Sequence, residues 1–360
     1  MKQEDYRKLI SGETAGLKSA LSRFFLRAAA RVFSTIIALR NLLYSKGWLK
    51  THRVSAVVIS IGNITAGGTG KTPLTIWVCN WLLKQNISCA ILTRGYKTRQ
   101  KSNFKTQNRI DEPAILAKSC PRAKIIVNPD RVAGATEAVN KFGAKVLIMD
   151  DGFQHRRLDR DLDIVVIDAM RPFGYGKMLP AGLLREPVEA LKRVDAVVIT
   201  RCDQLPEYKL GQLERRLQSV NPDMIVVRSI HASVCAKSMG NEEISIEQLK
   251  EKTIFAFCGI GNPDAFLGTI RKLGLNLVGS KIYDDHHYYT NNDIADIYGE
   301  AKRLDANLLL STQKDWTKTA LPASVIKDIP FAYLVIELRF VAEEDKLKGL
   351  LERSLAGKIL

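Results

Sequence analysis

The residue types best suited to phosphate chemistry stand together in one run, Thr65-Ala66-Gly67-Gly68-Thr69-Gly70-Lys71-Thr72. Glycines in such a run let backbone N–H groups turn toward phosphate oxygens, which larger side chains would obstruct. The ammonium group of Lys71 can reach the β- and γ-phosphates of a nucleotide, and the hydroxyl of Thr72 can bind Mg²⁺. The run departs from the P-loop pattern at its first position, where Thr65 replaces glycine. It predicts a nucleotide-binding loop, with an ordinary structural turn as the alternative.

Two neighbouring carboxylates stand where a metal ion bound to that nucleotide would need them. Residues 146–150 are apolar, as in a buried strand, and the run ends in Asp150-Asp151. An apolar strand that ends in aspartate is the layout of a Walker B element. In a doubly wound sheet this strand and the strand before the loop end at the same edge, so either aspartate could bind the metal held by Thr72. The alternative is that the pair only caps the strand end.

Other polar groups carry weaker signals. Residues 150–157 could hold a phosphorylated substrate or form a salt-bridged loop, and residues 94–109, with six Lys or Arg and no acid, could bind an anion or be solvated. Asp111 could act chemically or cap a helix. The run Asp285-His286-His287 sets a carboxylate beside an imidazole, which is a usual pairing for a general base but a weak signal alone.

The elements that must position these residues alternate between short apolar runs and helical patterns. The expected strands are 54–61, 88–94, 124–127, 146–150, 164–168, 196–200 and 224–227, and helices are expected at 73–85 and 131–142. Alternation of this kind predicts an α/β fold, a doubly wound and mostly parallel sheet with helices on both faces.

After about residue 228 the pattern restarts and predicts a smaller second α/β lobe. Its expected elements are strands 253–257 and 308–312, helices 264–273 and 291–304, and a charged helix from about residue 342. The expected division is therefore a basic N-terminal segment at 1–50, a P-loop nucleotide-binding core at 51–228, and the smaller lobe at 229–360.

The N-terminal segment is both basic and apolar. Residues 1–50 hold ten Lys or Arg against three Asp or Glu, a large share of the formal net charge of +16. Arg23, Arg27 and Arg31 recur every fourth residue, so they share one face of a helix whose remainder is rich in Phe, Ile and Val. Such a helix suits the interface of an anionic bilayer, and packing on the protein's own core is the alternative. Its longest uncharged run, 32–39, is far short of the ~20 residues that span a membrane.

Composition excludes several classes of protein. With 46% hydrophobic and 26% charged residues among 360, the chain is neither collagen-like nor largely disordered. Its six cysteines show no CxxC pair and no metal-like spacing, which indicates reduced thiols and a cytosolic compartment. The positive charge indicates an anionic partner. No recognition-helix or base-stacking motif accompanies it, so nucleic acid is not expected, and no obligate protein partner is evident.

Several segments, taken in order, resemble the tetraacyldisaccharide 4'-kinase family, which acts in the lipid A pathway of Gram-negative bacteria. The matching segments are 60–65, 67–73, 93–96, 111–113, 150–155, 179–182, 184–186, 259–263, 285–286 and 314–315. Each piece is weak alone, but the ordered set is specific. The chain departs from the family at Gln313, where Glu is frequent, and at Lys97, where Gly is frequent.

The resemblance implies an enzyme that transfers the γ-phosphate of ATP to the 4'-hydroxyl of a tetraacyldisaccharide 1-phosphate, with ATP and Mg²⁺ as cofactors. The product would be the 1,4'-bisphosphorylated lipid A precursor, and the enzyme would bind peripherally to the anionic cytoplasmic face of the inner membrane. A membrane-associated P-loop ATPase switch is the main alternative, although such loops carry an additional Lys where this chain has Ala66. A nucleic-acid-binding ATPase is the other.

The resemblance also implies a role for individual residues. Asp111 would take the proton from the hydroxyl, and His286 would pair with it. Lys71 and Asp151 would complete the catalytic set. The implied metal ligands are Thr72, Asp150 and Glu186, and the implied substrate contacts are Arg94, Gln154, His155 and Arg185.

Overall fold

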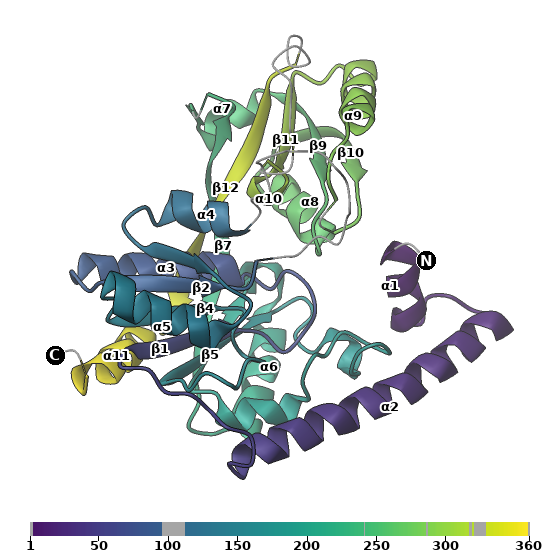
Figure 1. The fold of residues 1–360 in the computed structure, drawn as a ribbon. Coiled ribbons are helices and arrows are strands. Elements are labelled where there is room, and N and C mark those ends of the chain that lie inside the picture. Colours follow the sequence, from purple (N-terminus) through teal and green to yellow (C-terminus); the bar gives the residue numbers. More distant parts are fainter. Residues whose placement is uncertain are drawn as a thin grey trace. The chain divides into compact units, whose positions relative to one another are not determined.

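The computed structural model describes residues 3–95, 112–240, 242–285, 287–316, 319 and 329–358. The chain forms two compact units, and it passes between them within strands β7 (Ile225–Ser238) and β12 (Phe331–Ala342) (Figure 1). The larger unit comprises 5–101, 116–230 and 338–360, and the smaller comprises 1–4, 102–115 and 231–337. The C-terminal helix, expected with the smaller lobe, therefore clusters with the larger unit.

The larger unit contains a parallel sheet in the strand order β7-β6-β5-β1-β4-β2-β3. Its further strands are β1 (Val57–Gly62), β2 (Cys89–Thr93), β3 (Lys124–Val127), β4 (Val146–Asp150), β5 (Leu162–Asp168) and β6 (Ala196–Thr200). Neighbouring strands in this order pair in parallel. β1, β4, β5 and β6 are buried along their whole length, because helices cover both faces of the sheet.

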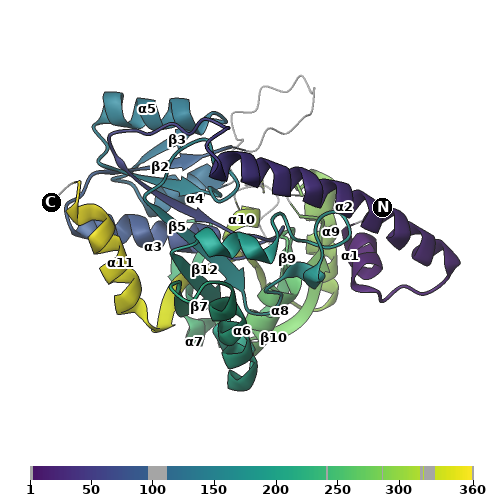
Figure 2. The same cartoon turned by 90° about the horizontal axis from the view of Figure 1, so that it is seen from below.

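Successive residues of each strand point to opposite faces, and each face has its own helices. Ile59 and Ile61 of β1 pack in one core with α3 (Lys71–Lys84) and α11 (Glu344–Ala356), whereas Val58 packs in another with α5 (Arg131–Phe142). Figure 2 shows α3 and α5 on opposite sides of the strands. α6 (Glu207–Val220) covers β5 and β6, and α4 (Glu112–Ser119) follows the undescribed residues after β2. The predicted doubly wound α/β architecture is confirmed.

The smaller unit is also α/β. Its parallel strands lie in the order β10-β9-β11-β12, with β9 (Thr253–Cys258), β10 (Asn276–Ile282) and β11 (Leu308–Thr312). α8 (Pro263–Lys272) and α9 (Asn291–Arg303) contribute to two different cores, one for each face of the sheet. The remaining elements are the short α7 (Ile246–Lys250), α10 (Gln313–Trp316) and β8 (Glu243–Ile244), which pairs antiparallel with β7.

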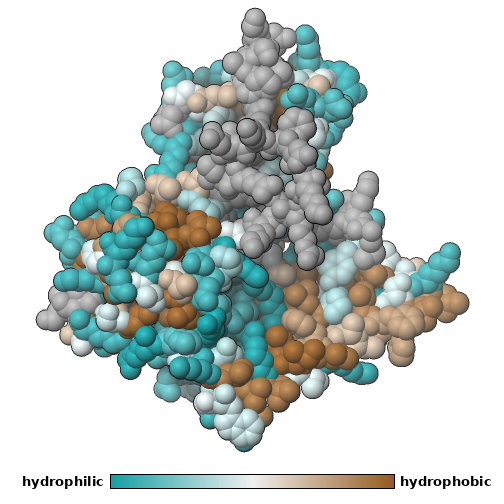
Figure 3. Space-filling model, viewed as in Figure 1, coloured by the Kyte–Doolittle hydropathy of each residue, from teal (hydrophilic) through white to brown (hydrophobic). Residues whose placement is uncertain are grey.

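Two helices precede the sheet, α1 (Gln3–Ser11) and α2 (Leu17–Ser45). Among the 29 residues of α2, only Ala30 and Ile37 are buried, whereas Phe24 and Phe25 are 64% and 62% exposed. Figure 3 shows apolar surface along α2. None of the helices in the described ranges has the length and hydropathy needed to cross a membrane.

Candidate active site

The predicted nucleotide-binding loop connects the end of β1 to the start of α3. Gly67 and Gly70 have positive φ angles of 122° and 98°, a conformation that side chains other than glycine rarely adopt. A Cβ atom placed at Gly67 or Gly68 would meet nothing within 4 Å, so the loop borders open space there. α3 then begins at Lys71, which directs the positive end of the helix dipole toward that space.

Two side chains at the end of β6, Thr200 in its last position and Arg201 directly after it, fix the orientation of the loop peptides. Arg201 Nη2 donates to the Gly68 carbonyl at 3.1 Å, and Thr200 Oγ1 donates to the Thr69 carbonyl at 2.8 Å. In a trans peptide the next N–H points away from the carbonyl, so the N–H groups of Thr69 and Gly70 point away from these donors. Backbone N–H groups left free of carbonyl partners at a helix start fit the phosphates of a nucleotide.

Asp151 lies between two cations. Its Oδ1 is 3.3 Å from Lys71 Nζ, and both carboxylate oxygens accept from Arg185 Nη1, at 2.9 and 3.2 Å. Burial opposes ionisation of this carboxyl, but the charges of Lys71 and Arg185 outweigh burial and lower its pKa to about 2. Asp151 is therefore a fixed anion that orients the two cations, and it is a poor proton acceptor at neutral pH.

Asp150 and Thr72 lie at the same edge of the sheet. Asp150 is the last residue of β4 and pairs in register with Ile61 of β1. Its buried carboxylate accepts from Thr75 Oγ1 at 3.1 Å, and Thr75 stands one turn after Thr72 on α3. A hydroxyl and a carboxylate suit Mg²⁺, which usually takes one or two carboxylates with phosphate and water oxygens. Among the described residues, no cluster of three or more His, Cys, Asp or Glu suited to a metal occurs.

A tight turn after β4 brings the next residues against β1. The N–H of Gly152 donates to the Ile61 carbonyl at 3.0 Å. A Cβ atom on Gly62 would lie 2.5 Å from the Cβ of Phe153, so the close approach of the turn requires glycine at that position. This contact explains why a strand end followed by Gly152 and Phe153 folds back beside the loop.

Gln154 and His155 follow the turn, and each has a buried polar atom to which the described residues offer no hydrogen bond. Gln154 Nε2 donates to the Asn63 carbonyl at 2.8 Å, whereas its Oε1 and the Nε2 of His155 have no hydrogen-bond partner within the described part of the chain. Burial, together with the charges of Arg131 and Arg160, lowers the pKa of His155 to about 4, so the imidazole is neutral at pH 7. Buried polar atoms without partners are rare, which suits groups that contact a substrate.

Arg131 and Arg201 belong to the site although the sequence did not point to them. Arg131 is the first residue of α5, and its buried guanidinium donates to the Asp150 carbonyl at 3.1 Å. Burial lowers its pKa to about 10, with a further contribution from the charge of the exposed Arg94. Arg201 pairs with Asp168 at 2.6 Å behind the loop. Arg201 directly follows the predicted strand 196–200, and Arg131 is the first residue of the predicted helix 131–142, so a basic residue at the end of a strand or the start of a helix is the signal that would have identified them.

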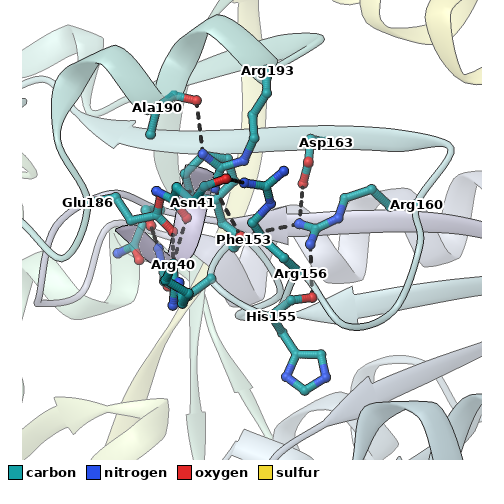
Figure 4. Close-up of polar contacts among 12 residues, drawn as sticks. Arg40, Asn41, Phe153, His155, Arg156, Arg160, Asp163, Glu186, Ala190 and Arg193 are labelled. Atoms are coloured by element: carbon teal, nitrogen blue, oxygen red, sulfur yellow. Dashed lines mark hydrogen bonds and ion pairs between the residues drawn. The ribbon is translucent and has the colours of Figure 1, made fainter. Parts of the chain in front are cut away.

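Glu186 contacts a different set of residues. The side chain is 0% exposed, its Oε1 accepts from Arg40 Nη2 at 2.9 Å, and its Oε2 accepts from Asn41 Nδ2 at 3.0 Å and Arg193 Nη2 at 3.1 Å (Figure 4). Its three donors are side chains of α2 and of the short helix η2 (Val188–Arg193). The metal-binding role implied for Glu186 stays a prediction.

Two predicted residues, Asp111 and His286, lie outside the described residues. Their implied pairing therefore stays a prediction. The described neighbour His287 stacks on Tyr283, with ring centroids 4.5 Å apart, and its Nε2 is 3.1 Å from Asp293 Oδ2.

Comparisons with known proteins agree with this geometry. The family model described as Tetraacyldisaccharide-1-P 4'-kinase matches residues 22–356. A Tetraacyldisaccharide 4'-kinase of Halothermothrix orenii is 33% identical, with 82% of each chain covered, and one of Chlorobaculum parvum is 34% identical, with 96% of this chain and 98% of the relative covered.

A solved structure is also similar. The "apo" form of LpxK from Aquifex aeolicus, crystallised in complex with ATP, superposes with a TM-score of 0.69 at 29% identity. The superposition covers 92% of this chain and 99% of that chain. With a P-loop at the end of β1, paired aspartates at the end of β4 and a family match over nearly all residues, the chain belongs to the tetraacyldisaccharide-1-phosphate 4'-kinase family.

Proposed function

We propose that the enzyme transfers the γ-phosphate of ATP to the 4'-hydroxyl of a tetraacyldisaccharide 1-phosphate and so makes the bisphosphorylated lipid A precursor. The observation that carries this proposal is the arrangement of Lys71, Asp151 and Arg185 beside a P-loop in a chain of this family. Phosphoryl transfer passes through a loose transition state, so its catalysis rests on positioning and on neutralising charge.

The proposed nucleotide site is built from the loop and the start of α3. The N–H groups of Thr69 and Gly70 and the ammonium of Lys71 would hold the phosphates. Thr72 and Asp150 would hold Mg²⁺, which neutralises charge on the phosphate oxygens. Arg185 lies 2.9 Å from Asp151, so its guanidinium is positioned to face the transferred group or the acceptor.

The acceptor hydroxyl needs a base, and Asp151 is unsuited to that task. A carboxylate whose pKa is held near 2 by two cations takes up a proton poorly. Among the carboxylates in the family's motifs, Asp111 is the one that the resemblance assigns to proton removal, with His286 as its partner. We propose this assignment on that resemblance, together with the unsuitability of Asp151.

The lipid nature of the acceptor accounts for α2. Each CH₂ group taken from a bilayer into water costs about 0.8 kcal/mol, so an acylated acceptor stays in its membrane. The exposed side chains of α2 include Phe24, Phe25 and Val32, and Arg27 and Arg31 stand on the same helix. We propose that this helix binds the anionic cytoplasmic face of the inner membrane without crossing it.

The test is transfer of label from γ-labelled ATP to tetraacyldisaccharide 1-phosphate in detergent micelles with Mg²⁺. Lys71→Ala should lower the rate at least ~100-fold, because it removes a charge that faces the transition state. Lys84→Ala is the matched control, because Lys84 is an exposed residue in the last turn of the same helix. Release of free phosphate with no labelled lipid from the wild-type enzyme would contradict the proposal.

A further inference from the structure

Glu186 is a buried anion whose partners come largely from α2. Two of its three donors, Arg40 and Asn41, are side chains of that helix, and the third is Arg193. The Asn41 carbonyl in turn accepts from Arg156 Nη1 at 2.9 Å. A fully buried carboxylate is stable only while it is paired, so these contacts fix the position of α2 against the core.

Apolar packing of α2 is incomplete along its length. Ala30 and Ile37 are buried, Leu26, Phe33, Leu43 and Tyr44 are half-buried, and the other large apolar side chains of the helix are exposed. Figure 4 shows Arg40, Asn41 and Glu186 gathered at one point. The C-terminal third of α2 is therefore the part whose position against the core depends most on the charge of Glu186. We call this packed position the seating of α2.

The residue before Glu186 reaches the active site. Arg185 holds both oxygens of Asp151, while its backbone N–H donates to the Ile64 carbonyl at 2.7 Å, directly before the loop. The loop residue Ala66 donates in return to the Leu183 carbonyl at 2.7 Å. One short segment thus contacts α2 through Glu186 and the catalytic anion through Arg185.

We propose that Glu186 is a positioning residue that couples the seating of α2 to the Arg185–Asp151 contact. Phosphate transfer is then fast only when α2 is seated on the core, which ties catalysis to the helix proposed to meet the acceptor's membrane. This inference rests on the proposed function.

The experiment perturbs the contact from the α2 side and leaves Lys71, Asp151 and Arg185 unchanged. Arg40→Ala removes one donor and leaves Arg193 to pair with Glu186, so the carboxylate keeps a cation. Arg122→Ala, which removes an exposed guanidinium from the turn before β3, is the matched control, and Arg40→Lys restores the charge. All are assayed as full-length chains in the micelle assay, with kcat and the KM for ATP determined separately.

We expect Arg40→Ala to lower kcat roughly tenfold, since small misplacements of catalytic groups are costly, while the KM for ATP changes less than about twofold. Arg40→Lys should recover most of the rate, and Arg122→Ala should keep the wild-type kcat. Combining Arg40→Ala with Arg185→Lys should give a loss smaller than the product of the single losses, because both act on one contact.

Three results overturn the inference. A kcat for Arg40→Ala equal to that of Arg122→Ala would show that the seating of α2 does not affect the active site. Losses that multiply in the double variant would show that Arg40 does not act through Arg185. A wild-type enzyme that makes no labelled lipid would refute the proposed function itself, and the coupling with it, whereas either of the first two results leaves that function intact.

Discussion

The nucleotide loop and helix α2 are built in opposite ways. The loop is held from several directions, by Arg201 and Thr200 behind its carbonyls and by the 183–185 segment along its first residues. α2 buries two of its 29 residues and exposes most of its large apolar side chains. The first region is fixed before any ligand arrives, whereas the second leaves its binding surface open.

The difference follows from what each region has to meet. Phosphoryl transfer requires charges placed to within a fraction of an ångström, and buried ion pairs and fixed peptides provide that placement. A bilayer surface is fluid and has no fixed shape, so a helix needs only an apolar face and positive charge to bind it. Precise placement is therefore concentrated in the core of the larger unit, and the proposed membrane contact lies on α2.

The largest effect is expected for Asp151, the carboxylate that lies between Lys71 and Arg185. Asp151→Asn should lower kcat about 100-fold or more, because Lys71 and Arg185 lose the charge that orients them. The KM for ATP should change much less. Asp159→Asn, at an exposed position after the same turn, is the control, and label transfer in micelles is the measurement. A kcat within twofold of wild type would mean that the fixed anion is dispensable.

A smaller effect is expected on α2, and on binding rather than chemistry. Phe24→Ser combined with Phe25→Ser should weaken binding to anionic vesicles roughly 10- to 100-fold. Full burial of one ring contributes about 1.5–3 kcal/mol, and a ring at the bilayer interface is expected to gain roughly half of that. The matched control is Phe142→Ser, which alters a partly exposed ring on α5. Sedimentation with vesicles measures the binding. Unchanged sedimentation of the double variant would contradict the proposal that α2 binds the membrane surface.

Behind the loop we expect an effect on nucleotide affinity. Arg201→Met should raise the KM for ATP about tenfold, because the Gly68 carbonyl loses a charged donor. The single variant also removes the cation that pairs with the buried Asp168, so its stability will fall. Adding Asp168→Asn should restore the melting temperature while the KM stays high. If the double variant recovers the wild-type KM for ATP together with the melting temperature, the loop does not depend on Arg201 directly.

The smallest effect concerns pH. The folded protein lowers the pKa of His155 from the ordinary 6.5 to about 4, so the native state favours the neutral imidazole. The resulting stability is present above pH 6.5 and is lost as the pH falls toward 4. Denaturant unfolding between pH 7 and 4.5 should show about 1–2 kcal/mol less pH dependence in His155→Gln than in wild type. Identical profiles would mean that His155 is not buried as described.

The sequence predicts the parts of the site whose residues are neighbours in the chain. The Thr65–Thr72 loop, the Asp150-Asp151 pair and the strands that carry them depend on local spacing, so each can be read from one short run. The contacts of Glu186 with Arg40 and Arg193 join residues far apart or in irregular segments, and no local pattern encodes them.

The sequence also does not predict the two long strands, β7 and β12, in full. The sequence predicts that β7 ends at Val227, whereas the strand continues to Ser238. The prediction stops early because the residues after Val227 mix polar and apolar side chains and do not form one apolar run. β12 was not expected at all, although its first half is strongly apolar. Both strands pass from one unit to the other, and a division into separate lobes does not predict strands that belong to both.

Under the proposed function, phosphate transfer takes place at a preformed site in the larger unit, and α2 brings that site to the membrane that contains the acceptor. The most direct test compares label transfer to tetraacyldisaccharide 1-phosphate in anionic vesicles with transfer to the same lipid in detergent micelles. The account predicts that Lys71→Ala abolishes both, whereas the Phe24→Ser and Phe25→Ser double variant loses transfer in vesicles and keeps it in micelles. Equal loss of both by the α2 variant, or loss of neither, would contradict the division of roles.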